Sequence, residues 1–328
     1  MKTENLDEDV LFNLRREEVL PEFHDPFIIT GYRKPYLSII NCVKSSVMFS
    51  CNESFNILSH FVSFVFFIFL FVLCFKSELD IKDVETWPLA SNMLGNIGFT
   101  LMSTIAHTFN SMSVETRHKC FYLDYAAISI YAFCSGQAIF FYASAFFSDN
   151  IFLNNSYLFS IVGALISITS TLLNCFSRMK WQSKKYIIRT LTYICAYIWN
   201  FLPYGYRLLT CTNILDCDKS GLKLAILNST LFLMAGILNV TKIPERFYPG
   251  KFDCCGQSHN LMHIFLSVGS YLQLQFIRNE MSRGFQPKKN YYYSLLATIF
   301  VINMNLLIAI LFPTKCKSAN VVQPKKSK

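Results

Sequence analysis

Residues 57–75 read ILSHFVSFVFFIFLFVLCF, a stretch without Asp, Glu, Lys or Arg. A helix of about 20 apolar residues is long enough to cross a bilayer, so this stretch predicts a membrane-spanning helix. Seven more apolar segments follow, at residues 88–107, 121–147, 157–176, 186–210, 221–243, 258–279 and 291–313. The expected fold is therefore all-α, a polytopic membrane helical bundle with a seven-helix core and an eighth transmembrane helix.

The composition supports a membrane protein. Hydrophobic residues make up 52% of the 328 residues and charged residues only 16%, whereas soluble domains carry about 25% charged residues. These values exclude a disordered chain and a disulfide-stapled miniprotein. The formal net charge is +9, but the basic residues form short clusters between apolar segments, as expected beside anionic lipid headgroups. Membrane lipids are therefore expected partners, and nucleic acid is not.

Three regions follow from this pattern: an N-terminal tail at 1–50, the helical bundle at 51–313 and a basic C-terminal tail at 314–328. The polar start offers no signal peptide, so the first apolar helix is expected to act as its own insertion signal. Most Lys and Arg residues fall on the side of the two tails, which the positive-inside rule places in the cytosol. Four basic residues of the last loop count against this orientation: Arg278, Arg283, Lys288 and Lys289.

Three histidines are expected to meet at one membrane face. His107 ends the second predicted span, whereas His259 and His263 begin the seventh. Because consecutive spans run in opposite directions, these positions share a face whichever way the bundle is inserted. His259 and His263 are spaced i, i+4, so both rings project from one side of a helix and can chelate one cation. Three imidazole ligands with a fourth position for water are typical of catalytic zinc, and we predict Zn²⁺ here.

Two polar residues are expected at the same depth. Asp124 lies near the start of the third span and could act as a general base toward a water. Ser103 precedes His107 by one helical turn and could orient its ring or meet a substrate. A His pair or a buried Asp can also serve packing alone, but ionisable groups inside a membrane are usually functional. We therefore predict Asp124 and Ser103 as catalytic residues.

The other polar features are expected to be structural. His24 and His118 are predicted to be solvated, and His60 is predicted to hydrogen-bond with Asn56 on the same helix face. Cys211 and Cys217 share one loop and could form a disulfide. Asn154 lies in a glycosylation sequon in a predicted outer loop.

Four blocks of the chain resemble the progestin and adipoQ receptor family. They are GYRKPYLSIINCVKSSVMFSCNESFNILSH at 31–60, the Ser-x-x-x-His-Thr-Phe motif at 103–109, LDY at 123–125, and IPERFYPGKFDCCGQSHNLMH at 243–263. The long last block and the eighth span are similar to the membrane progestin receptor branch rather than the adiponectin receptor branch. Cys51, which precedes Asn52, favours the same branch.

This resemblance implies zinc held by His107, His259 and His263 near the cytosolic face of the plasma membrane. It also implies kinship with the alkaline ceramidases, in which Asp124 and Ser103 match motif residues. A steroid or sphingolipid ligand and a G protein are the partners that the resemblance implies. Asn260, which follows His259, departs from the Gln expected in relatives.

Three functions remain open from the sequence. The first is a membrane receptor for a progestin or another lipid. The second is a zinc-dependent lipid amide hydrolase, a ceramidase-like amidohydrolase whose product acts as the signal. The third is a scaffold in which zinc only clamps helices together.

Overall fold

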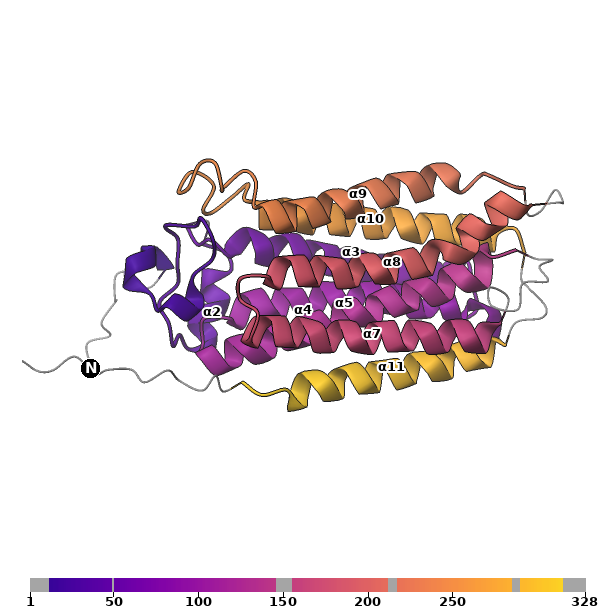
Figure 1. Ribbon diagram of the computed structural model, residues 1–328, viewed down its shortest axis with the longest axis horizontal. Helices are drawn as coiled ribbons and strands as arrows, with labels where there is room; N and C mark the ends of the chain where they lie inside the picture. The colour runs from indigo at the N-terminus through magenta and orange to yellow at the C-terminus, as the bar shows by residue number, and fades with distance from the viewer. Residues whose placement is uncertain (1–11, 49, 146–154, 212–216, 285–289, 315–328) are drawn as a thin grey trace, which may run out of the picture.

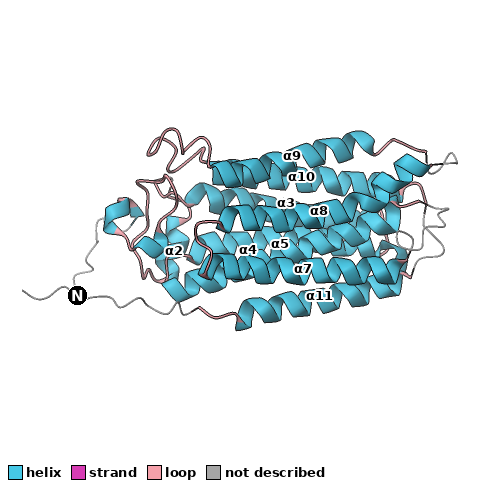
Figure 2. Cartoon of the chain, viewed as in Figure 1, coloured by secondary structure: helices cyan, strands magenta, loops and turns pink. Residues whose placement is uncertain are grey.

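Eight long helices run side by side along the long axis of the protein in a computed structural model of the chain (Figure 1). The structure describes residues 12–48, 50–145, 155–211, 217–284 and 290–314. The helices are α3 (Ser54–Ser77), α4 (Trp87–Phe109), α5 (Val114–Ala143), α7 (Ser156–Met179), α8 (Lys185–Thr210), α9 (Leu222–Thr241), α10 (Ser258–Met281) and α11 (Tyr291–Leu311). No strand occurs in the described residues (Figure 2). The predicted all-α membrane bundle is confirmed, and each predicted span overlaps one of these helices.

Length and composition make five of these helices able to cross a membrane: α3, α5, α7, α9 and α11. The other three, α4, α8 and α10, have similar lengths and lie in the same bundle. Helices α4 and α10 bury many of their Asn, Ser, Gln and His side chains against neighbouring helices, as expected for polar groups within a membrane. The protein is therefore an integral membrane protein.

Helix α5 forms the centre of the bundle. It contacts α4, α7, α8, α10 and α11, and Phe140, Phe141 and Tyr142 near its end are fully buried. Small residues let other helices approach closely: a Cβ added at Gly136 would lie 2.2 Å from Oδ1 of Asn200 on α8. The outer surface carries exposed apolar side chains such as Phe61 and Phe69 of α3, which suit contact with lipid.

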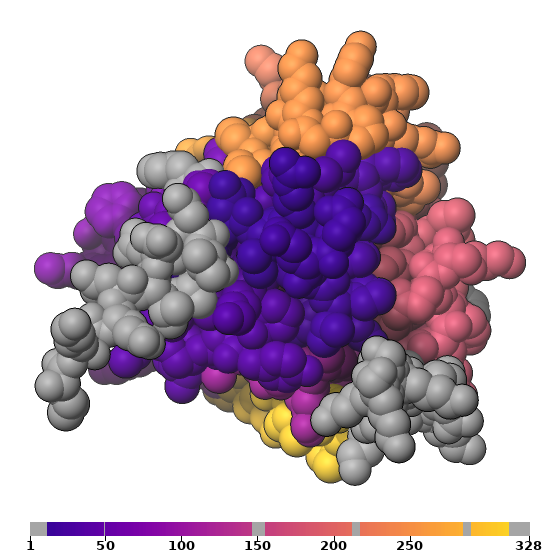
Figure 3. All heavy atoms as spheres, turned by 90° about the vertical axis from the view of Figure 1, so that its left-hand side faces the viewer, coloured from indigo at the N-terminus to yellow at the C-terminus, as the bar shows by residue number. Residues whose placement is uncertain are grey.

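The N-terminal segment, residues 12–48, folds over one end of the bundle (Figures 1 and 3). It contains η1 (Arg16–Glu18), η2 (Pro21–Phe23) and α2 (Ile39–Ser45). Its backbone amides at Ile29 and Thr30 donate hydrogen bonds to the carboxylate of Asp253, which lies between α9 and α10. The segment and the loop before α10 therefore form one structured cap on this end, which we call the site end.

The opposite end is held by polar contacts within the protein. Arg207 of α8 and Glu280 of α10 form a buried ion pair at 2.5 Å. The Cys211–Cys217 disulfide is present after α8. The sequon at Asn154, residues 1–11 and residues 315–328 lie outside the described residues.

Candidate metal centre

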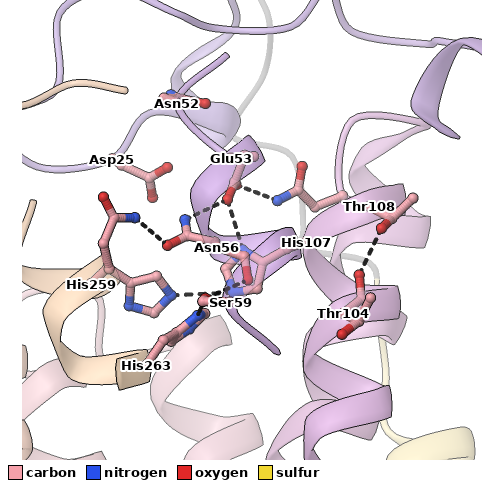
Figure 4. A network of polar contacts seen from close by, with 12 residues as sticks. Asp25, Asn52, Glu53, Asn56, Ser59, Thr104, His107, Thr108, His259 and His263 are labelled. Atoms are coloured by element: carbon pink, nitrogen blue, oxygen red, sulfur yellow. Dashed lines mark hydrogen bonds and ion pairs between the residues drawn. The ribbon is translucent and has the colours of Figure 1, made fainter. Parts of the chain in front are cut away.

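The three predicted histidines come together at the site end (Figure 4). His107 lies in the last turn of α4, and His259 and His263 lie in the first two turns of α10. One ring nitrogen from each residue lies within 4.8 Å of the other two. The Nε2 atoms of His107 and His259 are 3.2 Å apart. The convergence expected from the parity of the spans is therefore observed.

This arrangement fits a zinc ion. Zn–N bonds of about 2.0–2.1 Å in a tetrahedron place ligand nitrogens about 3.3 Å apart. The His107–His259 pair already has this spacing, at 3.2 Å. A ring nitrogen of His263 lies within 4.8 Å of the other two nitrogens, close enough for the three residues to share one ion. His107 and His263 are buried, and neutral imidazoles in such surroundings are suitable metal ligands.

Glu53, which the sequence interpretation did not select, holds His107. Its Oε2 atom lies 2.7 Å from Nδ1 of His107. The same oxygen accepts a hydrogen bond from Asn56 at 2.8 Å, and Oε1 accepts one from Asn110 at 2.5 Å. A carboxylate on Nδ1 places the proton there and leaves the Nε2 lone pair facing His259, as in carboxylate–histidine–metal triads.

The electrostatics of this carboxylate match that role. Burial raises the pKa of Glu53, whereas the positive charges of Arg33 and Arg117 lower it and favour the carboxylate form beside a neutral His107. A carboxylate that is hydrogen-bonded to a ligand imidazole strengthens a cation site.

His263 and α10 are held by α3. The Nδ1 atom of His263 lies 3.3 Å from the hydroxyl of Ser59, which leaves Nε2 free for a ligand. Asn260, the residue that departs from the family pattern, donates to Oδ1 of Asn56 at 2.6 Å. Asn56 in turn bonds to Glu53. The amide at position 260 therefore links α10 to the carboxylate that orients His107.

The end of α4 is fixed by Arg33. Its guanidinium group is buried and donates to the backbone oxygens of His107 and Thr108 at 2.6 and 2.8 Å. It also donates to Oδ1 of Asn110 at 2.7 Å. A cation at a helix C-terminus is favourable because it meets free carbonyls and the negative end of the dipole. The N-terminal segment thus sets the position of the His107 backbone.

Asp124 and Ser103 lie beside the histidines without belonging to the cluster. Both line the same cavity as His107, His259 and His263. Ser103 of α4 lies near the Asp124 carboxylate of α5. A carboxylate that faces a cavity next to three imidazoles can accept a proton from a water or from a ligand.

The remaining histidines differ from expectation. Asn56 bonds to Glu53 and Asn260 rather than to His60, so the predicted Asn56–His60 pair is wrong. The His60 ring packs against His263, with ring centres 3.8 Å apart. His24 and His118 are partly buried and line the cavity instead of facing solvent.

A cavity of about 770 Å³ extends from the histidines into the bundle. It is lined by seven of the long helices, all except α11, and by part of the N-terminal segment. Helices α8 and α9 contact each other far less than α9 and α10 do. Leu233 and Ile237 of α9 line the cavity and are largely accessible.

Comparisons with known proteins identify the family. Residues 49–274 match the model of the haemolysin-III-related family. The chain belongs to this family. It is 30% identical to membrane progestin receptor gamma-A of Danio rerio, over 92% of this chain and 94% of that protein. It is 32% identical to human membrane progestin receptor gamma, over 80% and 79% of the two chains. Human membrane progestin receptor delta is 31% identical over 82% and 78%.

These relatives confirm the resemblance to the progestin and adipoQ receptor family and to its membrane progestin receptor branch. The matched region contains Glu53, Ser103, Asp124 and the three histidines. The one sequence signal for Glu53 is its place in the Asn-Glu-x-x-Asn-x-x-x-His block at 52–60, which marks it as a motif residue but does not reveal its contact with His107.

Proposed function

We propose that this chain is a membrane receptor for a progestin-like steroid, with one Zn²⁺ held by His107, His259 and His263 next to the ligand cavity. The observation that carries this proposal is the cavity of about 770 Å³ that ends at the histidines. Its size is within the range of about 300–1,000 Å³ that is typical of small-molecule sites. Its place within a membrane bundle suits an apolar ligand, and the relatives are named membrane progestin receptors.

The contacts around the cluster suggest how binding is transmitted. Zinc would join α4 to α10, and Arg33 joins the end of α4 to the N-terminal segment. A ligand that prefers one spacing of α4 and α10 shifts the population of conformations. That shift reaches the cap at the site end by two connections. Arg33 joins the N-terminal segment to the end of α4, and Asp253 joins the same segment to the loop before α10. We propose that this end faces the cytosol and that the protein resides in the plasma membrane.

A second function is favoured by Asp124 and Ser103, which line the same cavity beside the histidines. Zinc, when bound, would supply Lewis acidity and lower the pKa of a water. In amide hydrolysis a water oxygen bonds to the acyl carbon and the C–N bond breaks. Asp124 would take a proton from that water and give it to the leaving nitrogen. Ser103, on the same wall of the cavity as His107, would contact the substrate.

One experiment separates the two functions. Purified protein in lipid nanodiscs is tested for saturable binding of tritiated progesterone and for hydrolysis of a fluorescent ceramide. The receptor proposal predicts saturable binding that survives in Asp124→Asn, with ceramide turnover at background. The hydrolase proposal predicts that the wild-type protein hydrolyses the ceramide and that Asp124→Asn abolishes this activity. Asp83→Asn, the same change at an exposed position, is the matched control for both assays. Absence of saturable progestin binding by the wild-type protein refutes the receptor proposal.

A further inference from the structure

A second polar site lies in the same cavity, away from the histidines. Gln273 of α10 and Tyr131 and Ser135 of α5 line the cavity and are all buried. Gln273 follows His263 by ten residues on α10, and a rise of 1.5 Å per residue separates them by about 15 Å along the helix. The lining between the two sites includes Phe99 and Ile128. The cavity thus has polar groups at the histidines and at Gln273, with apolar side chains such as Phe99 and Ile128 between them.

The hydrogen bonds of this second site run in one direction. The amide nitrogen of Asn96 lies 3.4 Å from Oδ1 of Asn92, which turns the Asn92 amide nitrogen toward Ser135. That nitrogen donates to the Ser135 hydroxyl at 2.9 Å. The Ser135 hydroxyl in turn donates a hydrogen bond to Oε1 of Gln273 at 2.6 Å. The orientation of the Gln273 amide follows from this chain of donors.

Tyr131 reinforces the same orientation. Its hydroxyl donates to Oε1 of Gln273 at 2.7 Å, so this oxygen accepts two hydrogen bonds. The hydrogen bonds of the described residues leave Nε2 of Gln273 without a partner. Gln273 therefore keeps an N–H donor for the cavity that it lines.

We infer that Gln273 is the subsite for a carbonyl oxygen at the end of the ligand remote from the three histidines. This inference rests on the proposed receptor function and specifies its ligand as a rigid apolar molecule with a hydrogen-bond acceptor at that end, as in a ketosteroid. An amide N–H selects a ketone over a methylene because its own hydrogen bond is otherwise lost. Tyr131 and Ser135 are positioning residues that fix the amide.

The test compares progesterone with two analogues in which either its ring ketone or its side-chain ketone is replaced by a methylene group. The wild-type protein is expected to prefer progesterone over one of these analogues by about tenfold. Gln273→Met keeps the length of the side chain but lacks the amide. This variant is expected to lose the preference for progesterone and to bind that analogue with the same affinity as the wild type. Gln137→Met is the matched control, because Gln137 is buried but does not line the cavity.

A second variant protects the test against misfolding. Tyr131→Phe removes one of the two donors that fix the amide, and it is expected to reduce the same preference while zinc content stays at the wild-type level. If the wild-type protein does not bind progesterone saturably, the proposed function fails and the inference with it. If the wild-type protein binds but Gln273→Met and Tyr131→Phe both retain the wild-type preference, or the wild type shows no preference, the inference alone is overturned.

Discussion

Replacement of Glu53 by Gln tests whether this carboxylate prepares His107 for a metal. Glu53 accepts hydrogen bonds from three donors, the ring of His107 and the amides of Asn56 and Asn110. A Gln side chain of the same shape has only one oxygen. Its amide nitrogen must face at least one of these donors, and the negative charge beside the ring is lost.

The expected effect is on zinc affinity. Changes to groups that hold a metal ligand typically lower affinity about 10–100-fold, and each factor of ten corresponds to about 1.4 kcal/mol. We expect Glu53→Gln to lower the zinc affinity about tenfold, because Gln can still accept a hydrogen bond from His107. Glu53→Ala is expected to lower it by about a hundredfold. The assay is competition for zinc against a series of chelators, with the purified protein in nanodiscs.

The matched control is Glu78→Gln. Glu78 is partly exposed at the other end of the bundle, where it pairs with Arg278. We expect wild-type zinc affinity in this variant. Helical content and thermal unfolding confirm that each variant is folded before affinities are compared. A folded Glu53→Gln or Glu53→Ala protein with wild-type zinc affinity would refute the role of Glu53.

Two further predictions concern packing and pH. Gly136→Ala should destabilise the protein by about 1–3 kcal/mol, because the added Cβ would lie 2.2 Å from Oδ1 of Asn200. Gly205→Ala is the control: its added Cβ meets nothing within 4 Å, so this variant should be neutral or slightly stabilised. Equal shifts of the unfolding temperature in the two variants would contradict the close approach of α5 and α8. Burial lowers the pKa of Lys242, just after α9, from 10.5 to about 8. The folded protein therefore binds fewer protons there than the unfolded chain between these values, and its stability rises with pH. Lys242→Met should be more stable than the wild type near about pH 7, with a smaller difference near about pH 9; an unfolding temperature difference that does not shrink with pH would contradict this.

The sequence predicted the helices well because lipid imposes a simple pattern. Each span needs a long apolar segment, and such segments mark all eight long helices. Boundaries were less certain where a helix continues beyond its apolar part. Helix α5 begins at Val114, seven residues before the predicted span, because its first two turns contain charged and polar residues such as Glu115 and Arg117. Hydropathy does not register those turns.

The histidine cluster was predictable because span parity and i, i+4 spacing fix which residues share a face. The partners of those histidines were not predictable in the same way. The Glu53–His107 contact joins two helices across 54 positions of sequence, and no local spacing reveals it. Asn56 shares a helix face with His60, but its hydrogen bonds go to Glu53 and Asn260. Local periodicity shows which side chains share a face, whereas packing between helices decides which of them bond.

The most direct test of the metal centre is the zinc content of the purified protein. Elemental analysis of the wild-type protein, purified without added chelator, is predicted to give about one zinc per chain. His263→Ala is predicted to lose most of that zinc, while His118→Ala, the same change outside the cluster, keeps it. A wild-type protein that takes up no zinc, or a His263→Ala protein that retains a full equivalent, would contradict the central claim that three imidazoles from α4 and α10 bind one ion.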